Sequence, residues 1–212
     1  TLCNGVFSAN QSVFNNSSIS IAGNATLHDV DINALYIRKG VKTAIAGNII
    51  ADRLSLLNYS ILTLDGNITV RSITPLESGA IGLLDGNGHT VTLDLTEKSL
   101  SDRASIDNFS TISEDTKLAL LLDDEQFIGS YRIADKIRSF IDDFSIFLDS
   151  APDSCIGVIN KNNQTLTYGN FVYSLSHSVE DQELILTVDV SENADSCYLV
   201  WADSKDHLTK QH

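Results

Sequence analysis

The chain has 212 residues, and its 28 aspartates and glutamates outnumber its 14 lysines and arginines, which gives a formal net charge of −14. A surface this acidic repels the phosphates of nucleic acids and anionic lipids, so we expect neither nucleic-acid binding nor membrane insertion. No stretch approaches the roughly 18 apolar residues that a membrane-spanning helix needs. Because no nucleotide or metal motif is visible either, no cofactor and no metal are expected.

A tetrapeptide that ends in Gly-Asn occurs four times in the first ninety residues. Ile-Ala-Gly-Asn ends at Asn24 and at Asn48, and Leu-Asp-Gly-Asn ends at Asn67 and at Asn87, with spacings of 24, 19 and 20 residues. A fixed period near 20 is typical of a solenoid, in which each repeat buries its apolar residues only by stacking on its neighbours. The repeat therefore predicts the architecture of residues 1–95.

An alternating pattern follows each of these asparagines. Six residues later stands an apolar residue, then a polar one and a second apolar one; the first apolar positions are Val30, Leu54, Ile73 and Leu93. Period-two alternation is typical of a strand with one buried face, and Gly-Asn tolerates the positive φ of a tight corner. We predict an all-β chain in which residues 1–95 form a parallel β-solenoid, with the geometry of a right-handed β-helix.

The four asparagines suggest a structural role at the corners of the coils. Asn24, Asn48, Asn67 and Asn87 occupy the same position of the repeat. Side-chain amides that stack along a solenoid can hydrogen-bond to each other as a ladder. We predict such a turn ladder.

The same repeat supplies the candidate binding residues Asp65, Asp85 and His89. Asp65 and Asp85 share one repeat position, so the sequence places their carboxylates about one strand spacing apart. Glycosidases use carboxylate pairs with a wider separation, and the alternatives are that each Asp caps its own turn or that the pair holds calcium. His89, next to that turn, is either a structural hydrogen-bonding group or a general base. No catalytic residue is assigned.

The repeat ends after Leu95, and residues 96–116 are polar and form a predicted boundary segment. Residues 117–212 are expected to form a β-rich C-terminal module that caps the solenoid. Its last two strands, joined across Glu180-Asp181-Gln182, look like an antiparallel hairpin, and residues 134–144 fit either a strand or a helix. The predicted strands are residues 117–122, 130–133, 144–148, 156–159, 171–175 and 184–188.

The C-terminal module contains two cysteines and the single tryptophan of the chain. Cys155 and Cys197 form a possible disulfide, with buried free thiols as the alternative. Trp201 either stacks on a sugar ring or packs under the end of the module. Trp201 is therefore a candidate for carbohydrate binding.

Several segments resemble one family of bacterial surface proteins. Residues 129–135, 146–148, 166–176 and 183–188 are similar to a module of autotransporter-adhesin-like proteins, whose passengers are parallel β-helices, and residues 84–91 resemble a coil common among β-helix proteins. The resemblance implies a secreted or cell-surface, non-enzymatic adhesin segment that serves as a rigid spacer or binds host or matrix carbohydrate or protein. The alternatives are a polysaccharide-active β-helix enzyme and a self-associating surface scaffold.

Overall fold

The computed structural model describes residues 2–3, 7–23, 25–75, 81–137, 143–192, 199–202 and 208–211. Within these residues the chain is built almost entirely of strands, and its one helical element is the 3-10 turn η1 (Phe109–Thr111). The prediction of an all-β chain is confirmed. No helix of the described part is long or apolar enough to cross a membrane.

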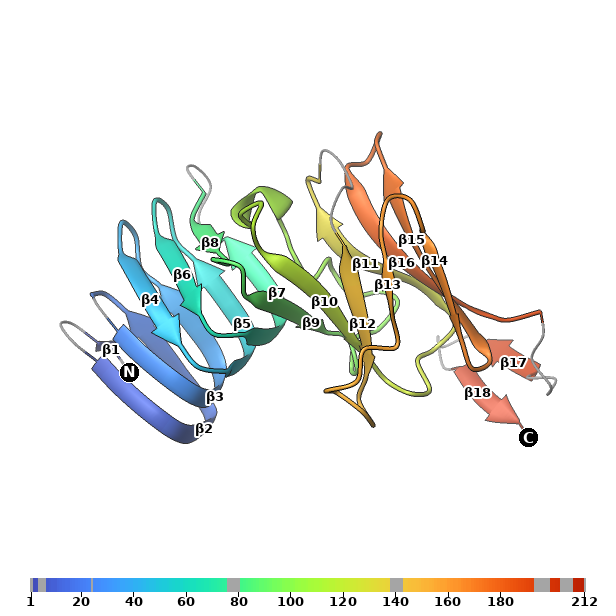
Figure 1. Ribbon diagram of the computed structural model, residues 1–212, viewed down its shortest axis with the longest axis horizontal. Helices are drawn as coiled ribbons and strands as arrows, with labels where there is room; N and C mark the ends of the chain where they lie inside the picture. Colours follow the sequence, from blue (N-terminus) through green and yellow to red (C-terminus); the bar gives the residue numbers. More distant parts are fainter. Residues whose placement is uncertain are drawn as a thin grey trace.

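The main element of the fold is a nine-stranded sheet, which we call the long sheet. Its strands follow the order β1-β2-β3-β5-β7-β9-β10-β12-β13, and every neighbouring pair is parallel except the last. Figure 1 shows the strands stacked one behind the other from the N-terminal end of the molecule. The strands are β1 (Leu2–Cys3), β2 (Phe7–Ile21), β3 (Ala25–Ile37), β5 (Ile49–Leu56), β7 (Ile68–Pro75), β9 (Thr90–Asp94), β10 (Lys117–Leu122), β12 (Phe144–Leu148) and β13 (Gly157–Ile159).

A second, smaller sheet closes the coils on the opposite side. This short sheet has the order β4-β6-β8, with β4 (Lys42–Ala46), β6 (Ile61–Asp65) and β8 (Leu83–Asp85) all parallel. Along the chain its strands alternate with β5, β7 and β9, so that each coil contributes one strand to each sheet. The N-terminal part of the chain is therefore a parallel β-solenoid of about four turns, as predicted.

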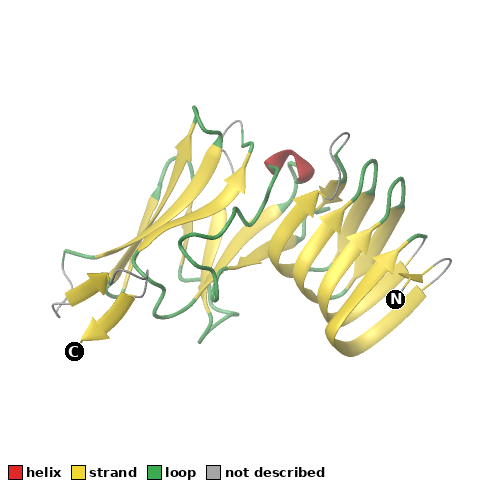
Figure 2. Ribbon diagram, turned by 180° about the vertical axis from the view of Figure 1, so that it is seen from behind, coloured by secondary structure: helices red, strands yellow, loops and turns green. Residues whose placement is uncertain are grey.

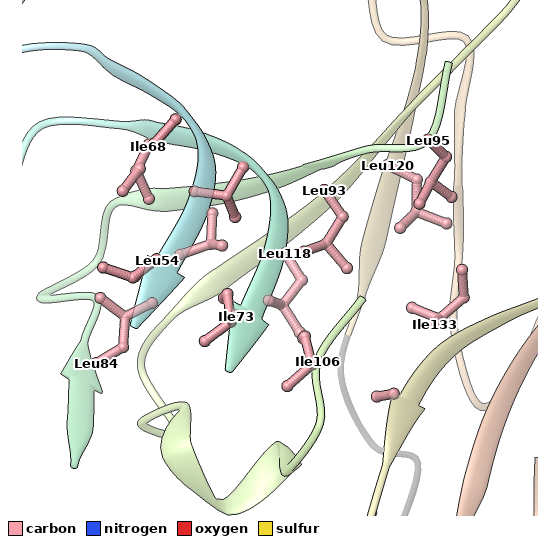
Figure 3. Close-up of a cluster of buried hydrophobic side chains, with 14 of the residues drawn as sticks. Leu54, Ile68, Ile73, Leu84, Leu93, Leu95, Ile106, Leu118, Leu120 and Ile133 are labelled. Carbon is pink, nitrogen blue, oxygen red and sulfur yellow. The ribbon is translucent and has the colours of Figure 1, made fainter. Parts of the chain in front are cut away.

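The core consists of columns of apolar side chains that point into the coils. One column runs through six neighbouring strands of the long sheet, and each of its members is at most 2% exposed. Figure 3 shows leucines and isoleucines from successive coils converging on this interior. Each fully buried aliphatic side chain contributes about 1.5–3 kcal/mol relative to an exposed one. The column consists of Val30, Ile49, Ile68, Val91, Leu118 and Phe144.

The first copy of the Gly-Asn tetrapeptide is not equivalent to the other three. Gly47, Gly66 and Gly86 lie where a short-sheet strand passes into a long-sheet strand, whereas Gly23 follows a long-sheet strand. The alignment of Val30 with Leu54 was therefore wrong, because the register pairs Val30 with Ile49. The alignment of Leu54 with Ile73 was correct, whereas that of Ile73 with Leu93 was wrong, because Leu93 pairs with Val70.

Glycine is required at these corners because successive coils touch there through their backbones. Gly47 has a φ of +78°, so it uses the left-handed conformation that glycine favours. Gly66 has a different reason: a Cβ at this position would lie 2.0 Å from the carbonyl oxygen of Gly47. A Cβ at Gly86 would likewise lie 2.4 Å from Thr116 Oγ1. Glycine at these positions thus permits close contact between coils as well as a tight turn.

The stacking of strands continues beyond the end of the sequence repeat. β10 pairs in parallel with β9, and β12 pairs in parallel with β10. The polar segment between β9 and β10 adds an irregular coil. In it, Ile106 forms isolated β-bridges with Ile73 and with Ala134, and Ile112 forms one with Leu84. Figure 2 shows η1 in this segment, beside the point where the regular coils end. The division at residues 95 and 116 stays a prediction about folding units, although the long sheet has strands on both sides of this segment.

An antiparallel sheet follows the parallel stack. Its order is β11-β16-β15-β14, and β15 and β16 form the predicted hairpin. β13 pairs antiparallel with β12 at the end of the long sheet. Part of the ambiguous stretch 134–144 is described as the end of β11, and residues 138–142 lie outside the described part. The strands are β11 (Gly129–Asp135), β14 (Thr165–Tyr168), β15 (Phe171–Ser178), β16 (Glu183–Val190), and a separate pair, β17 (Leu199–Ala202) and β18 (Leu208–Gln211).

Candidate binding face

The outward side of the short sheet brings together most of the candidate residues, and we call it the short-sheet face. It is formed by the outward side chains of β4, β6 and β8, because the alternate residues of each strand point into the core. Three rows cross it, in the registers Lys42–Ile61–Leu83, Ala44–Thr63–Asp85 and Ala46–Asp65. The first row carries long side chains, whereas the other two carry side chains that are small, or short and polar.

Asp65 and Asp85 do not stack on each other, so that part of the prediction was wrong. Asp85 stands opposite Thr63, and Asp65 stands opposite Ala46. The reason is a difference in repeat length: β4 and β6 are offset by 19 residues (Lys42 with Ile61), whereas β6 and β8 are offset by 22 (Ile61 with Leu83). The two carboxylates therefore belong to different rows of the face.

Each carboxylate has its own surroundings. Asp85 accepts hydrogen bonds from Thr63 Oγ1 at 3.3 Å and from the backbone N–H of Asn87 at 3.2 Å, so it caps its own turn. The side chain of Asp65 is 74% exposed, and its Oδ1 lies 3.9 Å from Nε2 of His89, which is 35% exposed. The face thus presents an accessible acceptor with an imidazole beside it.

The corner asparagines bond to neighbouring coils, but through backbone groups. Asn87 Nδ2 donates to the carbonyl of Leu64 at 3.3 Å, and Asn67 Oδ1 accepts from the backbone N–H of Thr90 at 3.0 Å. The backbone N–H of Asn48 donates to Asp29 Oδ1 at 3.1 Å. These bonds tie the coils together in place of an amide-to-amide ladder. Asn24 lies outside the described residues.

A polar ladder that the tetrapeptide did not reveal crosses the outer side of the long sheet. Asn33 Nδ2 donates to Asp52 Oδ2 at 2.9 Å, and Arg71 Nε lies 3.6 Å from Asp52 Oδ1 and donates to Asp94 Oδ2 at 3.2 Å. Arg71 Nη1 also donates to Glu97 at 2.6 Å. Burial lowers the pKa of Arg71, but the hydrogen bond and charge of Asp94, together with Glu97 and Asp52, raise it above its ordinary value. Exposed ion pairs of this kind each contribute about 1 kcal/mol or less to the free energy of unfolding. The ladder therefore adds little stability, but it favours the strand register that brings these charges together.

A stacked pair of carboxylates does occur, but at the junction with the antiparallel sheet. Asp107 and Asp135 follow the bridged residues Ile106 and Ala134, so Asp107 of the irregular segment lies beside Asp135 at the end of β11. Burial and then the charge of Asp135 raise the pKa of Asp107, against the opposing charges of nearby Arg103, Lys136 and Arg53. Sequence alone did not indicate this pair because its two members belong to different parts of the chain.

Replacing Asp107 with asparagine is expected to stabilise the protein at neutral pH. The raised pKa means that the folded state keeps this proton to a higher pH than the unfolded state, so the group's contribution to stability falls as pH rises above the ordinary value of 3.8. Asp107→Asn removes that cost. The free energy of unfolding is expected to rise by less than about 1 kcal/mol, because solvent screens the charge. Urea unfolding at pH 7 and at pH 4 measures the gain, which should shrink at pH 4. An equal gain from the exposed Asp153→Asn would contradict the explanation.

The remaining candidates lie at the C-terminal end. Cys155 is exposed, and its thiol donates to the carbonyl of Gly157 at 3.2 Å. Cys197 lies outside the described residues, so the disulfide stays a prediction. The backbone of Trp201 pairs with Thr209 between β17 and β18, and its side chain is not among those described. The structure therefore does not bring Trp201 to the short-sheet face.

One groove opens beside the short-sheet face, and no sequence motif marked it. It has a volume of about 360 Å³. The one sequence feature at the groove is a pair of outward alanines in β4. They stand at the positions that Thr63 and Asp65 occupy in the neighbouring strand β6. Among the described residues no three His, Cys, Asp or Glu side chains are grouped as metal ligands would be. The groove is lined by Ala25, Thr26, Thr43, Ala44, Ile45, Ala46 and Asp65.

The chain was compared with protein-family models, with curated proteins and with solved structures, and none of them matches it. The description as a parallel β-solenoid therefore depends on the register of the strands.

Proposed function

We propose that this chain is a non-enzymatic segment of a secreted or cell-surface bacterial adhesin-like protein, in which it is a rigid spacer that presents a binding surface for host or matrix carbohydrate or protein. The observation that carries the proposal is the uninterrupted parallel ladder from β1 to β12, which joins successive coils by backbone hydrogen bonds. In a solenoid each coil contacts its neighbours directly, so such a ladder resists bending. The similarity of residues 129–135 and 166–176 to adhesin modules supports the same role.

The site geometry also supports binding in preference to turnover. The carboxylate of Asp65 is open to solvent, and Asp85 is engaged by Thr63 and by its own turn. Acid–base catalysis benefits from a desolvated group whose pKa is tuned by its surroundings, and an open carboxylate lacks that desolvation. An exposed acceptor beside small outward side chains is suited to a hydrogen-bonding ligand.

Small-angle X-ray scattering tests the spacer role. The full chain is expected to give the scattering of an elongated particle, with a maximum dimension that does not change as salt rises from about 0.05 to 1 M, because the ladder is not held by screened charges. A solid-phase assay against immobilised matrix proteins and glycans tests the binding role. A compact particle, or one whose maximum dimension depends on salt, would contradict the spacer role. The absence of any binding would contradict the binding role.

A polysaccharide-active enzyme is the second candidate, favoured by the 3.9 Å approach of His89 to Asp65. Incubation with a panel of neutral and acidic polysaccharides distinguishes the two roles. Release of oligosaccharides that is abolished by Asp85→Asn or His89→Gln would overturn the non-enzymatic role. The third candidate, a self-associating scaffold, predicts sedimentation that depends on concentration, and a strictly monomeric result would exclude it.

A further inference from the structure

The groove beside the short-sheet face lies at an interruption between two coils. In the long sheet β3 and β5 are fully paired from Val30 to Ile37. On the other side of the same coils, the first residues of β3 and the strand β4 form no ladder, and β4 pairs with β6 alone. Among the described residues, the backbone N–H of Ala25 donates to Thr43 Oγ1 at 3.1 Å near one end of this interruption, and the backbone N–H of Asn48 donates to Asp29 Oδ1 at 3.1 Å near the other. The groove is lined by the first residues of β3, by β4 and by Asp65 of β6.

The groove is lined by the edge of β4 that no strand of the described part pairs with. The N–H of Ile61 bonds to the carbonyl of Val41, and the N–H of Gly47 bonds to the carbonyl of Asp65, so these odd-numbered residues of β4 and its ends face β6. Since the backbone groups of successive residues in a strand point to alternate sides, those of Ala44 and Ala46 face the groove. No strand pairs with that edge among the described residues. A buried or half-buried backbone group gains free energy from any polar ligand that bonds to it.

The side chains of the groove add a second set of interactions. Thr26 is exposed and carries a hydroxyl, and Asp65 contributes a carboxylate whose side chain is 74% exposed. Ala44 and Ala46 have only methyl groups, so they leave a flat apolar floor between polar rims. This is a combination of donors, acceptors and small apolar patches.

We propose that the groove binds one ring of a neutral saccharide. A volume of about 360 Å³ lies at the lower end of the range for small-molecule sites, which is about 300–1,000 Å³. A sugar ring has hydroxyls for Asp65, Thr26 and the backbone groups on the outer edge of β4, and C–H faces for the alanine methyls. An anionic sugar is disfavoured by the net charge of −14. An inserted peptide strand does not fit, because the bond from Ala25 to Thr43 holds the two strands together.

The inference rests on the proposed binding surface and names its ligand class. Amide NMR spectra of the full chain are recorded during titration with methyl glycosides of glucose, galactose, mannose and N-acetylglucosamine. Small ligands bind weakly, so we expect saturable shifts of the Ala44 and Ala46 amides with a Kd on the order of 1–10 mM for at least one sugar. Asp65→Asn and the groove-filling Ala46→Leu should each weaken that binding at least about tenfold. Thr69→Leu, on the outer side of the long sheet, is the matched control and should leave it unchanged.

Four results would overturn the inference: no saturable shift at these amides with any of the sugars, equal weakening by Thr69→Leu, tighter binding of glucuronate than of the neutral sugars, or the same shifts from a trilysine peptide. Thermal unfolding of each variant excludes loss of fold as the cause. A sugar that shifts only residues elsewhere overturns the groove but leaves the proposed binding surface intact. The spacer role is judged separately by scattering.

Discussion

Replacing Ile49 with alanine is expected to lower the free energy of unfolding by about 2–5 kcal/mol, because it leaves a cavity in the apolar column at the centre of the solenoid. The Ile49 side chain is 1% exposed, and it stacks between Val30 and Ile68. A solenoid has no second core to compensate for a gap between coils, since each coil packs only on its neighbours. Urea unfolding followed by circular dichroism measures the loss.

Ile50 provides the matched control for this prediction. It is the next residue of the same strand, but its side chain points outward and is 54% exposed. Ile50→Ala deletes the same atoms and is expected to change stability by less than about 0.5 kcal/mol. Similar losses from the two variants would show that the inward and outward sides of β5 had been assigned incorrectly.

The substitution Gly66→Ala is expected to destabilise the protein by about 3 kcal/mol or more, because overpacking at a backbone contact has no flexible side chain to relieve it. The new Cβ would lie 2.0 Å from the carbonyl oxygen of Gly47 and 2.6 Å from its backbone N. The coils would have to separate locally, and the bond from Gly47 N–H to Asp65 O at 3.2 Å would be lost with that movement. A fall in the thermal midpoint measures the effect.

Gly40 separates this steric effect from backbone strain. It has a φ of +71°, but a Cβ there would meet nothing within 4 Å. Gly40→Ala should therefore cost only the strain of an L-residue in the left-handed region, about 1–2 kcal/mol. If Gly40→Ala were the more harmful of the two, the corners would depend on turn conformation more than on the contact between coils.

The sequence predicted those parts of the fold in which local pattern and tertiary structure agree. Alternation of apolar and polar residues located the strand from Leu184 to Val188, since one face of it is buried. The alternation at Leu54 and Leu56 falls in β5, although Ser55 between them is buried as well. The hairpin across Glu180–Gln182 was visible because its two strands are adjacent in the chain. These elements needed no information about distant residues.

The predictions that failed depended on register, which sequence spacing determines only when all repeats have equal length. The offset between neighbouring coils grows from 19 residues between Ile49 and Ile68 to 23 between Ile68 and Val91. Asp65 and Asp85 therefore do not stack, although their repeats look alike. The continuation of the long sheet through β10 and β12 was hidden for the same reason, because residues 96–116 form an irregular coil.

The candidate site was predicted in part. Asp65 and His89 do approach each other, but the groove depends on a missing ladder between β3 and β4, which leaves no mark in either strand. The carboxylate pair Asp107 and Asp135 required the bridge through Ile106, a contact between segments with different patterns. Features formed between coils could be found only once the register was known.

The equal offset of 19 residues in both sheets has a consequence for how such a protein can change its length. Lys42 pairs with Ile61 in the short sheet, and Ile49 pairs with Ile68 in the long sheet, so residues 42–60 form a unit that fits onto its own copy. An in-frame duplication of this unit would lengthen the stack by one strand spacing, about 4.8 Å, and leave every other pairing as it is. The unequal coils near β8 and the antiparallel β13 do not permit this. Among the described coils, residues 42–60 are therefore the unit whose duplication keeps the register of both sheets.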